Sequence, residues 1–256
     1  MDGCQLSRVR LQTCVDRRRI EILKQFVTER RYQRLADALP WRTRYLTVLV
    51  EDVFQPHNAS AVLRSCDAFG VQDVHIVENR NAYRVNPGVE LGTSQWLTLH
   101  RYRNTAHGVH NPPTEEPAVR SHQNTVRAVE ALRRRGYRVV ATTPHRDKVT
   151  PDSFDLSAGP AAVCFGAEME GLSDYLLREA DEYLKIPMHG FVESLNISVS
   201  AAITLYRLTT RLHESDINWQ ISPAESDGVF LQWLRASVRH WELIEARAEA
   251  ESRLSG

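Results

Sequence analysis

The chain has 256 residues, of which 42% are hydrophobic and 25% are charged, and its formal net charge is zero. This size and composition predict one folded catalytic domain with helical extensions. No apolar run approaches the roughly 18 residues that a membrane span needs, so we expect a soluble, cytoplasmic protein. The four cysteines lack the paired spacing of a zinc site, and we expect no bound metal.

Charge is unevenly distributed along the chain. Residues 1–44 carry eleven basic and five acidic side chains, whereas residues 214–256 carry four basic and eight acidic ones. A basic segment can neutralise phosphates and gain free energy from counterion release. We therefore expect residues 1–44 to form a helical extension that contacts a nucleic acid, and the alternative is an ordinary solvated helix face.

In chain order, apolar spacing first predicts a basic amphipathic helix over about 16–38, which ends before Pro40. The catalytic domain is expected over 45–213. Short β-rich runs predict five strands, at 46–50, 74–77, 137–141, 161–165 and 182–186. Helical patterns lie around them, at about 58–69, 123–135, 173–180 and 193–213. Strands that alternate with helices predict an α/β fold with a parallel sheet flanked by helices.

Two segments fall outside this alternation. Residues 104–122 are rich in Pro, His and Asn and lack periodicity, which predicts a surface insertion. Within the tail at 214–256, apolar residues at helical spacing predict a helix over about 225–250. We expect that helix to pack on the core or on a partner subunit.

The first motif, PHNASAVLRSCDAFG at 56–70, directly follows the first predicted strand. Asn58 is a plausible N-cap of the next helix and Gly70 its C′ residue. Ser60, Arg64 and Asp67 fall on the face opposite the apolar stripe. Arg64 would then lie near the carboxyl end of a strand, where open α/β sheets bind ligands. The alternative is a surface ion pair between Arg64 and Asp67.

The second motif is FGAEMEGLS at 165–173. Gly166 and Gly171 would allow a tight turn close to a ligand, and Ser173 could cap the following helix. Glu168 and Glu170 would repel a phosphate and no Lys follows, so we do not expect a phosphate-binding loop. Alone, the motif is also compatible with an ordinary turn between a strand and a helix.

The third motif is IPMHGFVESLNISVSAA at 186–202. A turn with Pro and Gly leads into a predicted helix whose first turns carry Ser194, Asn196, Ser198 and Ser200. Small polar side chains and free backbone groups suit a polar ligand such as an adenosine moiety. No dinucleotide-binding, P-loop, zinc-protease or serine-hydrolase signature is present.

In this order, the three segments resemble the three motifs of the SpoU/TrmH branch of the SPOUT methyltransferases, and the resemblance covers about 17–213. It implies a C-terminal trefoil knot that binds S-adenosyl-L-methionine (SAM), and a homodimer formed through the knot region. The implied reaction is methylation of the ribose 2′-hydroxyl of guanosine 18 in the D loop of tRNA. The alternatives are 2′-O-methylation of ribosomal RNA or another tRNA nucleotide, and a catalytically silent RNA-binding protein.

The resemblance also implies roles for single residues. Arg64 matches the arginine that acts on the ribose hydroxyl, and its polar neighbours match Asn58, Ser194 and Asn196. A guanidinium has a pKa above about 12, so we expect Arg64 to stabilise developing negative charge instead of accepting the proton. The expected SAM contacts are Thr142, Gly166, Glu168, Ile186, Met188 and Leu195. The expected RNA contacts are Arg17, Arg18, Arg19 and His57.

Overall fold

The computed structural model describes residues 16–84, 86–103, 122–144 and 149–254. They divide into two compact units: residues 43–219 form the larger unit, and the two terminal segments together form the smaller one. Much of the predicted insertion at 104–122 lies outside the described residues. None of the helices in the described part of the chain is long and apolar enough to cross a membrane.

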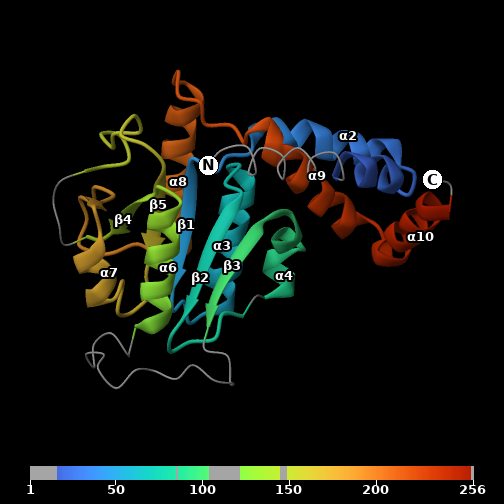
Figure 1. Cartoon of the computed structure of the whole chain (residues 1–256). Coiled ribbons are helices and arrows are strands. Elements are labelled where there is room, and N and C mark those ends of the chain that lie inside the picture. Colours follow the sequence, from blue (N-terminus) through green and yellow to red (C-terminus); the bar gives the residue numbers. More distant parts are fainter. Residues whose placement is uncertain (1–15, 85, 104–121, 145–148, 255–256) are drawn as a thin grey trace. The chain divides into compact units, whose positions relative to one another are not determined.

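The larger unit is built on a six-stranded sheet in the order β3-β2-β1-β5-β4-β6, with every neighbouring pair parallel (Figure 1). The strands are β1 (Leu46–Glu51), β2 (Asp73–Glu78), β3 (Thr98–Arg103), β4 (Arg138–Thr142), β5 (Ala161–Phe165) and β6 (Glu182–Leu184). The predicted α/β fold with a parallel sheet is confirmed. The strand β3 was not predicted, because its sequence TLHRYR has no apolar run.

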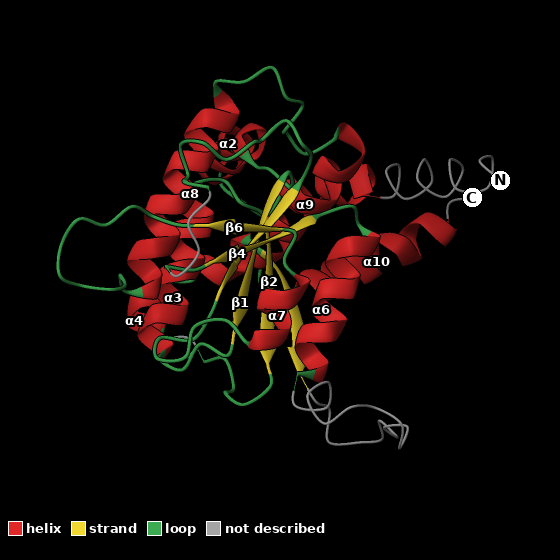
Figure 2. Cartoon of the chain, turned by 90° about the vertical axis from the view of Figure 1, so that its left-hand side faces the viewer, coloured by secondary structure: helices red, strands yellow, loops and turns green. Residues whose placement is uncertain are grey.

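Helices cover both faces of this sheet (Figure 2). On one face lie α3 (Pro56–Ala68), α4 (Pro87–Glu90) and α8 (Ile197–His213), and on the other lie α6 (Gln123–Arg134) and α7 (Asp174–Glu179). Apolar residues of α3 and α8 share one hydrophobic cluster with β1, and those of α6 and α7 share a second cluster with β4 and β5. All six residues of β1 are buried, as expected for a parallel strand covered on both faces.

Two predictions about the first motif are wrong. The helix α3 begins at Pro56 with Gln55 as its N-cap, so Asn58 lies inside the first turn and is not the cap; proline suits the first helical position because it has no N–H to leave unpaired. Ser60 is fully buried, and its Oγ donates to the Pro56 carbonyl at 2.8 Å. Gly70 does follow the C-cap with a φ of 77°, as predicted.

The smaller unit joins the two ends of the chain. The predicted helix over 16–38 is interrupted: residues 16–24 are helical, and α2 (Glu29–Ala38) begins after Thr28, whose side chain caps it. The predicted tail helix is also divided, into α9 (Pro223–Ser237) and α10 (Trp241–Leu254). An edge-to-face contact between Tyr32 and Phe230, with centroids 5.3 Å apart, packs α2 against α9.

Candidate active site

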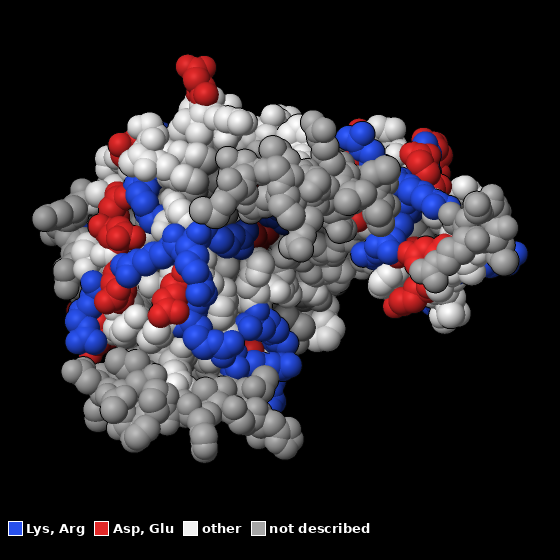
Figure 3. Space-filling model, viewed as in Figure 1, with Lys and Arg blue, Asp and Glu red and all other residues white. Residues whose placement is uncertain are grey.

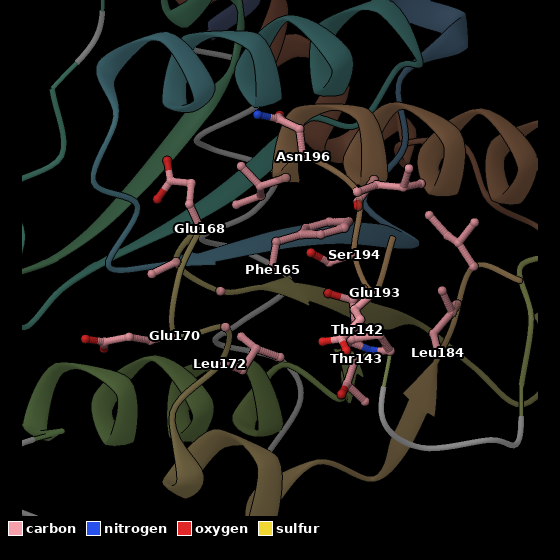
Figure 4. Close-up of a pocket in the computed structure, with 18 of the residues that line it drawn as sticks. Thr142, Thr143, Phe165, Glu168, Glu170, Leu172, Leu184, Glu193, Ser194 and Asn196 are labelled. Carbon is pink, nitrogen blue, oxygen red and sulfur yellow. The ribbon is translucent and has the colours of Figure 1, made fainter. Parts of the chain in front are cut away.

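A cavity of about 510 Å³ opens where β4 and β5 end in the larger unit (Figure 4). Four segments far apart in sequence and Leu177 of α7 line it. The segments are residues 142–144 at the end of β4 and beyond, 165–172 at the end of β5 and beyond, 184–188 at the end of β6 and beyond, and 193–204 up to and within α8. The second and third motifs therefore meet around one cavity. The carboxyl ends of parallel strands are the usual ligand-binding edge of such a sheet.

All six residues expected to contact SAM line this cavity, namely Thr142, Gly166, Glu168, Ile186, Met188 and Leu195. Of the four residues expected near the reacting hydroxyl, Ser194 and Asn196 also line it. Asn58 is not part of the lining but accepts a hydrogen bond from Asn196. Arg64 is not part of the lining.

The turn after β5 requires its two glycines. A Cβ on Gly166 would lie 2.0 Å from the carbonyl carbon of Gly171, which is far inside any allowed contact. Gly171 itself has a φ of 70°. Ala167 and Gly171 exchange two backbone hydrogen bonds of 2.9 Å, which close the turn. Only a residue without a side chain fits at 166, and this places bare backbone beside the cavity.

The Glu168 carboxylate holds the start of α3 instead of pointing a free charge at the cavity. It accepts hydrogen bonds from the backbone N–H groups of Phe54 and Gln55, both at 3.1 Å, and from Asn58 Nδ2 at 2.8 Å. Burial alone would raise the pKa of Glu168, but these hydrogen bonds outweigh it and the pKa is lowered. The second motif thus fixes the first through one ionised side chain.

A chain of amides extends this link to the third motif. Asn196 Nδ2 donates to Asn58 Oδ1 at 3.2 Å, while Asn196 Oδ1 accepts from the backbone N–H and hydroxyl of Ser198 and so caps α8. Asn58 is only 2% exposed. The bonds from Glu168 through Asn58 to Asn196 connect all three motifs, and the two asparagines hold α3 and α8 in position.

Arg64 lies on the exposed side of α3, and its Nη1 donates to the Val89 carbonyl of α4 at 3.0 Å. This hydrogen bond anchors the guanidinium against α4, on the face of the sheet that α3 covers. His57 is exposed in the first turn of α3. Both side chains are accessible to a large ligand.

The described lining of the cavity carries Glu168, Glu170 and Glu193 but no Lys or Arg. Apolar side chains such as Phe165, Leu172 and Leu184 and small polar ones such as Thr143 and Ser194 supply the rest of the wall (Figure 4). Such a wall disfavours phosphate and suits a ligand that is apolar in part and positively charged in part. Among the described residues no group of His, Cys, Asp and Glu is arranged to hold a metal ion.

The Thr142 side chain does not face a ligand, because its hydroxyl donates to the Cys164 carbonyl of β5 at 2.7 Å. Its contribution to the cavity therefore comes from its backbone and methyl group. By contrast, the Thr204 hydroxyl is buried in the lining and has no hydrogen-bond partner among the described residues. Thr204 was not predicted, because nothing in its sequence context marks it.

Glu51 is a second residue that the sequence analysis missed. This buried carboxylate at the end of β1 accepts hydrogen bonds from the backbone N–H and the hydroxyl of Ser173, both at 2.8 Å, and from Thr125 Oγ1 at 2.5 Å. Ser173 also caps α7 as predicted. A single acid at the end of the apolar run LTVLVE was the available signal.

Two of the three N-terminal arginines expected to contact RNA are engaged within the smaller unit. Arg17 Nε lies 2.7 Å from Asp227 Oδ2, and Arg19 Nη2 lies 2.6 Å from Glu249 Oε1. The hydrogen bond to Glu249 is the main cause that raises the pKa of Arg19. Arg18 is exposed. The acidic tail therefore neutralises part of the basic arm.

Comparison with known proteins agrees with this geometry. The model of the SpoU rRNA Methylase family matches residues 45–117 and 114–206, which is more than half of the chain. The chain belongs to the SpoU methylase family. The three motifs all lie within the matched residues.

Relatives of this SpoU methylase carry a common name. A tRNA (guanosine(18)-2'-O)-methyltransferase of Borreliella burgdorferi is 36% identical over 89% of this chain and 95% of that protein. The Thermus thermophilus protein of the same name is 35% identical over 81% of this chain and 97% of its own length. Both similarities extend over nearly the whole of the relative.

Solved structures show the same fold. The A. aeolicus TrmH/SpoU tRNA modifying enzyme superposes with a TM-score of 0.66 at 27% identity, over 82% of this chain and 98% of that one. The SpoU methyltransferase AviRb from Streptomyces viridochromogenes, in complex with the cofactor AdoMet, gives a TM-score of 0.53 at 26% identity, over 70% and 65% of the two chains.

Proposed function

We propose that this SpoU methylase transfers a methyl group from SAM to the ribose 2′-hydroxyl of guanosine 18 in the D loop of tRNA, and that it acts in the cytoplasm. The observation that carries the proposal is the similarity to the Borreliella burgdorferi tRNA (guanosine(18)-2'-O)-methyltransferase. It spans 228 residues, well beyond the part that the family model matches. It therefore supports the substrate as well as the cofactor.

The cavity fits SAM. Backbone groups at Gly166 and the apolar side chains of Ile186, Met188 and Leu195 would hold the adenosyl part, and the exposed Glu193 carboxylate in the lining suits the positive charge of the ligand. When bound, SAM supplies an electrophilic methyl group on its sulfonium. The protein contributes orientation, because holding two reactants in line removes much of the entropic barrier.

We propose that Arg64 stabilises the negative charge that develops on the ribose oxygen as its proton leaves, with an RNA phosphate helping to accept that proton. A positioned donor of this kind typically contributes about 10²–10³ in rate. Because Arg64 does not line the cavity of its own chain, the proposal includes a homodimer in which Arg64 meets the partner's cavity. The dimer would form through a trefoil knot made by the cavity-lining segments.

In this proposal Ser194 faces the reacting ribose from the cavity wall, while Asn58 and Asn196 position the motifs through their mutual hydrogen bond. Exposed Arg18 and His57 are expected to contact the RNA. Residues 1–44, 45–213 and 214–256 then serve as an RNA-contacting arm, a catalytic domain and a helical tail.

The experiment compares methyl transfer to two tRNA substrates that differ at one atom. We expect the purified protein to methylate a transcript with guanosine 18 and to leave unmodified the same tRNA carrying 2′-deoxyguanosine at that position. Equal transfer to both would place the methyl group elsewhere and overturn the proposal. SAM binding measured by calorimetry without any transfer to tRNA would instead indicate a silent RNA-binding protein.

A further inference from the structure

The helix α6 carries arginines on two of its sides. Toward α7, Arg133 Nη1 forms an ion pair of 2.7 Å with Glu179. The opposite side faces β3, the edge strand of the sheet. There the charges of Arg135, Arg127 and Arg134 act on the Tyr102 ring and oppose the rise that burial causes in its pKa. Arg127 and Arg134 are seven residues apart on α6 and share this face of the helix, and Arg135 follows at its C-cap.

Stacked aromatic rings of β2 and β3 lie beside these arginines. His75 and His100 are register partners on β2 and β3, and their rings stack with centroids 4.5 Å apart. The Tyr102 ring lies nearly parallel to His75, and its hydroxyl is 2.9 Å from His75 Nδ1. Burial and the nearby positive groups lower the pKa of His75 to about 3, so its ring is neutral at physiological pH.

One buried carboxylate, Asp73, holds two arginines and one histidine of this surface in place. Asp73 is 1% exposed and is contacted by Arg44 Nε at 3.1 Å, Arg135 Nη2 at 2.7 Å and His100 Nε2 at 3.2 Å. Burial would raise the pKa of Asp73, but these contacts outweigh it and lower the pKa. Both guanidinium side chains remain partly exposed, at 23% for Arg44 and 37% for Arg135.

We propose that the surface formed by Arg44, Arg127, Arg134 and Arg135 with the rings of His100 and Tyr102, here called the α6–β3 basic face, binds the phosphate backbone of the tRNA. Lys and Arg side chains gather over this part of the molecule in the space-filling view (Figure 3). Arginines neutralise phosphates, and the half-buried rings of His100 and Tyr102 lie beside them. The partner named here rests on the proposed function.

Charge elsewhere supports this assignment. The described lining of the cavity contains three acids and no Lys or Arg, so it offers no cation to the RNA backbone. Arg17 and Arg19 of the N-terminal arm are already paired with acids of the tail. The arginines on the β3 side of α6 are a source of positive charge in the catalytic unit itself.

The test uses Arg127→Ala combined with Arg134→Ala. Both side chains are exposed, whereas Arg44 and Arg135 hold Asp73 and their removal would disturb the fold. The matched control is Arg133→Ala, on the α7 side of the same helix. Fluorescence anisotropy with labelled tRNA gives the affinity across a KCl series, and calorimetry gives SAM affinity.

We expect the double variant to bind tRNA roughly tenfold more weakly at physiological salt, with a salt slope that is smaller by about one for each phosphate that is no longer neutralised. Replacement of the same two residues by Lys should restore most of the affinity. SAM affinity and the control should match the wild type. Unchanged tRNA affinity and slope in the double variant, or an equal decrease in the control, would overturn the inference. If the wild type itself neither binds nor methylates tRNA, the proposed function fails first.

Discussion

Replacement of Glu168 by Gln tests the hydrogen bonds that connect the three motifs. The wild-type carboxylate accepts three hydrogen bonds, from the backbone N–H groups of Phe54 and Gln55 and from the Asn58 amide. Glutamine keeps one acceptor oxygen and turns an NH2 group toward at least one donor. Hydrogen bonds to a charged group contribute about 1.5–3 kcal/mol each, and this side chain is only half-buried. We therefore expect a decrease of about 2–4 kcal/mol in the free energy of unfolding.

The pH dependence has a definite sign. The pKa of Glu168 is lowered in the folded protein from its ordinary value of 4.5, so its contribution to stability is fully present above that value. It is lost as the pH falls through the lower, folded pKa. Urea unfolding followed from neutral pH to about pH 3 should therefore show the gap between wild type and Glu168→Gln closing in acid.

Glu170→Gln is the control for this experiment, because Glu170 lies on the same turn but is 60% exposed and paired with Arg80 at the surface. Exposed pairs contribute about 0–1 kcal/mol. Equal unfolding free energies for the Glu168 and Glu170 variants, or a gap that widens in acid, would refute the structural role of Glu168.

Three further predictions concern the cavity and the termini. Gly166→Ala should abolish SAM binding in calorimetry or prevent folding, since its Cβ would overlap backbone. The control is Gly190→Ala, whose Cβ meets nothing within 4 Å and which should behave as wild type. Normal SAM affinity of the Gly166→Ala variant would contradict the turn geometry. Thr204→Val should raise the apo unfolding midpoint, because a buried hydroxyl without a partner costs about 1–3 kcal/mol; a lower midpoint would show that the hydroxyl is satisfied. Asp227→Asn with Glu249→Gln removes one ion pair from each of Arg17 and Arg19 and leaves Arg19 paired with Glu245. The tRNA affinity should therefore increase and its salt dependence steepen; an unchanged salt series would exclude competition between tail and RNA.

The fold was predictable where hydrophobic pattern and topology agree. The five apolar strand runs and the helices around them indicate a parallel α/β sheet. The edge strand β3 was not predicted, because aromatic and basic residues alternate over most of it and an edge strand needs no apolar run. The packing of the tail against α2 was also not predicted, because helical spacing says which face is buried but not what covers it.

The sequence predicts which segments form the candidate site but not which of their side chains contact one another. The glycines of the second motif indicate a tight turn whatever surrounds them. The role of Asn58 as a buried link depends on Glu168 and Asn196, which are 110 and 138 residues away. No local rule gives such pairs. For the same reason spacing placed Arg64 on an exposed face of α3 but could not give its partner on α4.

The central claim is best tested by nucleoside mass spectrometry of tRNA from a strain that lacks this protein. We expect 2′-O-methylguanosine at position 18 to disappear, to return when the wild-type gene is restored, and to remain absent with Arg64→Ala even though that variant binds SAM. Retention of the modification at position 18 in the deletion strain, with disappearance of a 2′-O-methyl group from another RNA, would contradict the proposed substrate.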